Sequence, residues 1–98
     1  MNGPLHTVNK SPYASTALEK CLDRIEDGAV LLIEDGVVGA LAANPLAARL
    51  AGRVVYVLGP DLTARGLDAL ARLDSVRVID HAMFVALAVR HSSVVAWR

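Results

Sequence analysis

The chain has 98 residues, in which ten lysines and arginines balance ten aspartates and glutamates. We expect a single domain over residues 1–98, because a chain of this length has no room for a second core. Its formal net charge is zero, so no overall field attracts nucleic acid or an anionic membrane. Functions that depend on bulk charge are therefore disfavoured.

Hydrophobic residues make up 54% of the chain, which is high for a small domain that leaves much of its surface in water. We expect the excess to lie at a subunit interface. Membrane insertion is the competing explanation, but no run approaches the roughly 20 apolar residues of a spanning helix. No signal peptide is visible, and the single cysteine, Cys21, cannot form an internal disulfide. These features predict a cytoplasmic component of an assembly.

A strand followed by a helix is predicted at the start of the chain. Residues 5–8 suit a short strand, and a helix begins near Ser15 or Thr16, because Thr16 and Glu19 have the spacing of a capping box. Asp27-Gly28 would end this helix. Its buried face is predicted at positions i, i+3, i+4 and i+7, which are Leu18, Cys21, Leu22 and Ile25.

The middle of the chain predicts two buried strands and the connection between them. Residues 29–33 and 54–58 are continuous apolar runs, which suit strands covered on both faces of a parallel sheet. Asp35-Gly36 is a common hairpin signal, but the segment after it does not alternate. Asn44-Pro45 as N-cap and first position, with Gly52 after the last turn, predicts a short helix. We therefore expect a crossover, not a hairpin.

The last part of the chain completes an α/β pattern. Asp61 is predicted to cap a helical turn that Gly66 interrupts, and a helix continues over residues 67–73. The remaining elements are a fourth strand, a helix capped by Asp80 and a fifth strand, over residues 76–79, 81–90 and 93–97. The buried face of that helix is predicted to comprise Met83, Phe84, Leu87 and Ala88. The whole predicts one small α/β domain, a mostly parallel open sheet of about five strands flanked by helices.

Several segments, in order and over nearly the whole chain, resemble the DsrH/TusB family. The most specific is residues 57–67, VLGPDLTARGL, which resembles the L-x-x-D-L-x-A-R-G-L signature of that family. The opening LHTVNKSP at residues 5–12 and EDGV at residues 34–37 also match. So does the closing pattern from Ile79 to Trp97.

This resemblance implies a DsrE-like fold and a place in a heterohexamer with two larger DsrE-like subunits, two copies of each. Such assemblies pass persulfide sulfur between cysteines toward a sulfur-carrier protein. One branch serves 2-thiolation of the wobble uridine in certain tRNAs, and another serves dissimilatory sulfur oxidation. The catalytic cysteine common to both lies on a partner subunit. Cys21 stands where some members, especially in the oxidation branch, carry a cysteine on the first helix.

Cys21 is the only residue that could accept a persulfide. Transfer requires an accessible thiolate that attacks the outer sulfur of a donor. However, Cys21 shares a helical face with Leu18 and Leu22, where free cysteine usually behaves as a small buried hydrophobe. Arg24, three residues on, could approach the sulfur. We favour a structural role, with an auxiliary persulfide site as the alternative.

Four further residues are candidates for a subunit interface: Asp61, Arg65, Gly66 and Trp97. Arg65 is either a solvated charge or an anchor for a neighbouring subunit, since its guanidinium suits bidentate pairing. Gly66 is expected at a left-handed or closely packed position. Trp97 either covers an edge of the core or contributes to an interface.

The motifs predict no cofactor and no metal. His6, His81 and His91 are scattered, unlike the closely spaced ligand pairs of zinc sites. Neither G-x-G-x-x-G, a P-loop nor G-x-S-x-G occurs, and no direct contact with nucleic acid or membrane is expected. Two alternatives to a relay subunit remain: a structural or regulatory homo-oligomer of the same fold, and an autonomous thiol enzyme that uses Cys21.

Overall fold

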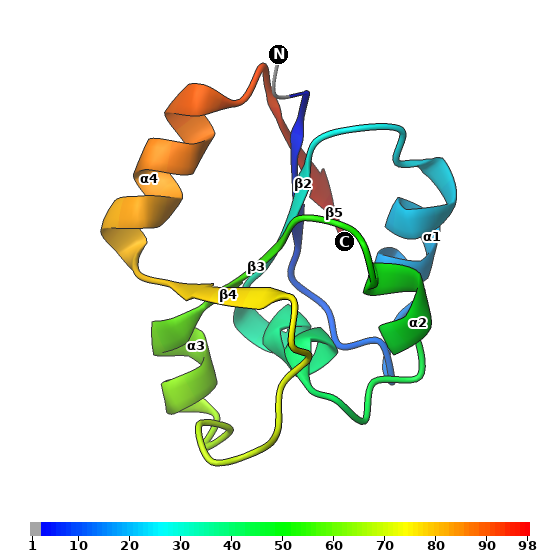
Figure 1. Ribbon diagram of the computed structural model, residues 1–98, viewed down its shortest axis with the longest axis vertical. Coiled ribbons are helices and arrows are strands. Elements are labelled where there is room, and N and C mark those ends of the chain that lie inside the picture. The colour runs from blue at the N-terminus through cyan, green and yellow to red at the C-terminus, as the bar shows by residue number, and fades with distance from the viewer. Residues whose placement is uncertain (1–2) are drawn as a thin grey trace.

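A five-stranded, all-parallel sheet organises the computed structural model, which describes residues 3–98 (Figure 1). The strand order is β4-β3-β2-β1-β5. The strands are β1 (Leu5–Val8), β2 (Ala29–Leu32), β3 (Val55–Leu58), β4 (Val76–Ile79) and β5 (Val94–Trp97). The α-helices are α1 (Ala17–Arg24), α2 (Ala47–Leu50), α3 (Gly59–Ala64) and α4 (His81–Arg90), with a 3-10 helix η1 (Glu34–Ala40). The predicted fold class is confirmed.

The strand order determines which face of the sheet each helix covers. From β1 to β4 the chain advances in one direction across the sheet, and only the last connection reverses to place β5 beside β1. Parallel crossovers are right-handed, so α1, α2 and α3 lie on one face, whereas α4 lies on the other (Figure 1). Among the described residues, α4 is the only helix on its face.

The two faces therefore have unequal cores. The larger core lies under α1, η1, α2 and α3, and it includes Val8, Leu18, Cys21, Val30, Leu32, Val37, Leu50, Val57 and Leu62. The smaller core lies under α4 and contains the buried residues Leu5, Ala29, Leu31 and Leu87. The central strands β1 and β2 are buried at every position, which explains the continuous apolar run in β2.

The connection after β2 is a crossover, as predicted. Gly36 lies in η1, and a Cβ placed on it would stand 2.0 Å from the carbonyl oxygen of Val8. That oxygen also accepts a hydrogen bond from the backbone N–H of Ile33 at 3.0 Å. Gly36 is thus required for close packing of η1 on the end of β1, and the Asp35-Gly36 pair forms no hairpin.

Two predicted helix starts differ from the structure. Thr16 makes no side-chain cap, and the backbone N–H of Ala17 donates instead to the Ser15 hydroxyl at 3.1 Å. Asn44 does accept from Leu46 N–H at 2.9 Å, but its amide also donates to Gly39 O at 2.8 Å, so α2 begins later and is only four residues long.

The predicted helix over residues 67–73 was wrong. This segment runs beside residues 40–42, where Leu73 N–H donates to Ala40 O at 2.9 Å and Ala42 N–H to Ala71 O at 2.9 Å. These hydrogen bonds consume the backbone groups that a helix would pair internally. Leu67 and Leu73 of this segment pack against the larger core.

Gly36→Ala is expected to lower the free energy of unfolding by about 3 kcal/mol, because the new methyl group meets backbone that cannot rotate away. The control is Gly66→Ala, where φ is +67° but nothing lies within 4 Å of a Cβ, and where only the backbone conformation costs about 1 kcal/mol. Urea denaturation of both variants measures the difference. Equal losses would contradict the close packing at Gly36.

Candidate functional site

Cys21, the candidate persulfide acceptor, lies on the inner face of α1. Its side chain is fully buried, with 0% exposed, in the larger core with Leu18 and Leu22 of the same helix. The i, i+3 and i+4 spacing turns these side chains toward the sheet. A donor sulfur reaches the thiol only if α1 separates from the sheet.

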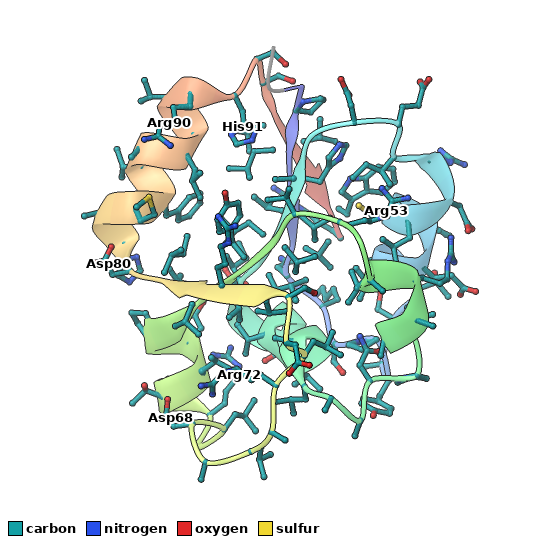
Figure 2. All side chains as sticks on the ribbon, viewed as in Figure 1. Arg53, Asp68, Arg72, Asp80, Arg90 and His91 are labelled. Carbon is teal, nitrogen blue, oxygen red and sulfur yellow. The ribbon has the colours of Figure 1, made fainter. Side chains whose placement is uncertain are left out.

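Burial raises the pKa of the Cys21 thiol from 9.0 to about 11, and the positive charge of Arg53 offsets part of this effect. Arg53 precedes β3 and lies beside α1 (Figure 2). The charge that acts on the sulfur therefore comes from Arg53, not from Arg24 as the sequence suggested. At pH 7 a thiol with this pKa is a thiolate in about one molecule in ten thousand.

Asp61 ties the carboxyl end of β3 to the carboxyl end of β2. Its Oδ2 accepts a hydrogen bond from the backbone N–H of Glu34 at 2.6 Å. Glu34 has φ of 50° and is the only non-glycine residue at positive φ within residues 3–98, a backbone conformation that needs support. Asp61 lies within the first turn of α3. The prediction that it caps this helix was wrong, because its carboxylate is bound to Glu34.

Arg65 is paired within its own chain. Its Nε donates to Asp35 Oδ1 at 2.9 Å, and Nη1 donates to Asp61 O at 3.3 Å. The Arg65 and Asp35 side chains are 31% and 68% exposed, and ion pairs this accessible contribute about 0–1 kcal/mol. Gly66 follows with φ of +67°, the left-handed position expected after a helix. An interface role for Asp61, Arg65 and Gly66 stays a prediction.

Trp97 lies on the edge strand β5 and packs partly buried against the larger core. Its Nε1 donates to Nδ1 of His6 on β1 at 3.1 Å, with the ring centroids 6.2 Å apart. Since an indole N–H can only donate, Nδ1 of His6 accepts and the ring proton lies on Nε2. That buried Nε2 has no partner within residues 3–98. The contact supports Trp97 as a cover for the core edge and leaves its interface role a prediction.

Two concave regions adjoin α4. One, of about 350 Å³, lies at the amino ends of β2 and β3, and its lining includes Val54, Tyr56, Leu87, Arg90 and His91. The other, of about 460 Å³, lies beside β4, and its lining includes Pro60, Val78, Asp80 and Met83. Figure 2 shows Asp80 at the start of α4 and both Arg90 and His91 at its end. Asp80 caps α4 as predicted, accepting from Met83 N–H at 2.9 Å.

The exposed apolar side of α4 was missed in the sequence. Val85 and Val89 are 64% and 80% exposed. Met83, predicted to be buried, is 42% exposed and lines the concave region beside β4. The composition of α4 could have indicated this exposed side. Arg90 is its only charged residue of the Lys, Arg, Asp and Glu types, and a helix that is apolar on all sides is normally buried on all sides.

Neither a metal centre nor a membrane span is found in the described part of the chain. Residues 3–98 contain no group of three or more His, Cys, Asp or Glu side chains that could hold a metal ion. His6 lies in β1, whereas His91 directly follows α4. No helix in the same range is both long and apolar enough to cross a bilayer.

The buried thiol makes stability depend on pH. The folded pKa is about 11 and the ordinary value 9.0, so above pH 9 the unfolded chain loses this proton first. Stability is therefore expected to fall by about 2 kcal/mol between pH 9 and 11 from this group. Urea melts of the natural chain and of Cys21→Ala test this, since other groups titrate equally in both. Parallel pH profiles would show that the thiol is not desolvated.

Asp61 and Arg65 are expected to differ in their effect on stability. Asp61→Ala removes the acceptor that holds Glu34 and should cost about 1–2 kcal/mol, whereas Arg65→Ala removes an exposed ion pair and should cost about 0.5 kcal/mol. Thermal melts of both variants provide the comparison. A larger loss of stability for Arg65→Ala than for Asp61→Ala would show that Arg65, not Asp61, holds this part of the fold.

Comparison with known proteins places the chain in a family. Residues 10–94 match the family model DsrH, described as DsrH like protein. Proteins named TusB are 40% identical over 96 residues in Pectobacterium parmentieri, 39% over 97 in Photorhabdus laumondii and 40% over 97 in Escherichia coli O81. Each match covers 95% of this chain and 99% of the relative.

The fold also has a close counterpart among solved structures. The crystal structure of the ychN protein from E. coli superposes with a TM-score of 0.86 at 18% identity, over 99% of this chain and 100% of that one. At this identity the likeness concerns the fold. The match to the family model and the full-length relatives together show that this chain belongs to the DsrH family.

Proposed function

We propose that this chain is a non-catalytic subunit of a cytoplasmic persulfide-relay complex. The observation that carries the proposal is the state of Cys21, the chain's one cysteine: it is fully buried and the pKa of its thiol is raised to about 11. Membership of the DsrH family supports sulfur relay as the setting. A relay subunit without an accessible thiol acts by positioning other subunits.

The chemistry of the relay explains why Cys21 is unsuited to it. The acceptor thiolate attacks the outer sulfur of a donor persulfide, a new S–S bond forms, the old one breaks, and the donor departs as a thiolate. No net oxidation occurs. The acceptor must be both ionised and reachable, and Cys21 meets neither requirement. The persulfide therefore belongs on a cysteine of a partner subunit.

The proposed partners are two larger DsrE-like subunits, with two copies of each chain in the complex, and a sulfur-carrier protein that docks on it. Exposed apolar side chains support a subunit that is covered in its assembly: Val78, Met83, Val85, Val89 and Val94. The relatives' name, TusB, favours delivery toward tRNA wobble-uridine thiolation over sulfur oxidation. A homo-oligomer without relay activity is the alternative, which the same exposed surface fits.

Co-expression of the tagged chain with the DsrE-like subunits of its own genome tests the proposal. All three chains should purify as one complex, and Cys21→Ala should leave both the complex and its sulfur transfer to the carrier unchanged. An intact complex in which Cys21→Ala abolishes transfer would refute the non-catalytic role. Recovery of a defined oligomer of this chain alone would favour the homo-oligomer.

A further inference from the structure

His6 is a buried polar residue near the centre of the sheet. It lies on β1, which pairs with β2 on one side and with β5 on the other, and only 7% of it is exposed. Its Nδ1 accepts a hydrogen bond from Trp97 Nε1 at 3.1 Å, whereas its Nε2 has no partner within residues 3–98. Buried polar groups are nearly always satisfied, so this ring depends on the single bond from Trp97.

A second proton on His6 is incompatible with that bond. The indole N–H can only donate, so the neutral ring accepts at Nδ1 and carries its proton on Nε2. A charged imidazolium donates from both nitrogens. Its Nδ1–H then faces the indole N–H of Trp97, donor against donor, and its Nε2–H still lacks an acceptor. The contact with Trp97 therefore exists only while His6 is neutral.

No carboxylate on the elements around His6 offsets a positive charge at this position. Alternate residues share a face of a strand, so His6 lies on the side of Val8, in the layer under α1. Neither β2 nor β5 carries a titratable side chain. Those of α1 are all exposed except Cys21, and they are Glu19, Lys20, Cys21, Asp23 and Arg24. The charge that acts on Cys21 comes from Arg53 and is itself positive.

The neighbour of His6 that can move away is β5. It is an edge strand, paired only with β1 (Figure 1), and its residues alternate between exposed and half-buried. The other neighbour, β2, is buried at every position. Release of β5 thus exposes little apolar surface and brings water to a charged ring, whereas release of β2 opens both cores.

We infer that His6 and β5 form a pH-sensitive edge of the sheet: when His6 gains a second proton, its bond to Trp97 breaks and β5 separates from β1. The proton comes from solvent, and the step reverses when the proton leaves. Histidine ordinarily titrates between about pH 5 and 8. The acid form exposes the Trp97 indole and an unpaired edge of β1, whereas the neutral form covers both. This inference does not depend on the proposed relay.

Fluorescence of the full chain tests the inference, because Trp97 is its only tryptophan. Lowering the pH from about 8 to about 5 should shift the emission reversibly to longer wavelength, while far-UV circular dichroism retains the helix signal. In His6→Gln the amide oxygen can accept from Trp97 but takes up no proton, so the shift should disappear. His81→Gln, at the exposed start of α4, is the matched control and should keep it.

Hydrogen exchange of the natural chain, corrected for the intrinsic pH dependence, locates the change and is decisive even where His6→Gln fails to fold. Protection of residues 94–97 should fall by about 10-fold or more at the acid pH, while residues 29–32 keep theirs. Unchanged emission and protection would overturn the inference. So would a shift that persists in His6→Gln, or a joint loss of protection in both strands, which indicates global unfolding.

Discussion

The handedness of the crossovers determines which face of the sheet each helix covers. The chain moves across the sheet in one direction from β1 to β4 and reverses once, after β4. Every connection before that point falls on one face, so α1, η1, α2 and α3 share a single large core. The last connection places α4 on the other face, where it packs on the sheet with no other described helix beside it. Burial of Cys21 and exposure of Val89 are consequences of this one topological constraint.

The same topology brings together the residues that carry the family resemblance. Glu34 and Asp61 follow adjacent strands, so a carboxylate after β3 reaches the backbone after β2. Arg65 reaches back from the end of α3 to Asp35. In the isolated chain these contacts are structural: they hold η1, and η1 in turn packs Gly36 against the end of β1.

The sequence predicted the features that depend on local pattern. All five strands were predicted, with β2 and β3 located by their continuous apolar runs, and Asp80 was correctly placed as the cap of α4. It could not predict partners distant along the chain: the carboxylate of Asp61 binds a backbone group 27 residues away, and residues 67–73 pair with residues 40–42 instead of forming a helix. Spacing around Cys21 indicated burial, but the influence of Arg53 on its thiol arises only in the folded chain.

We propose that this subunit positions the other subunits of a persulfide relay without carrying the sulfur itself. Loading the intact complex with persulfide from a cysteine desulfurase, followed by mass-spectrometric mapping of every cysteine, tests it most directly. We expect persulfide on a cysteine of a partner subunit and an unmodified Cys21. Persulfide on Cys21 at comparable occupancy would contradict it, because a buried thiol with a pKa of about 11 has neither the access nor the charge to accept sulfur.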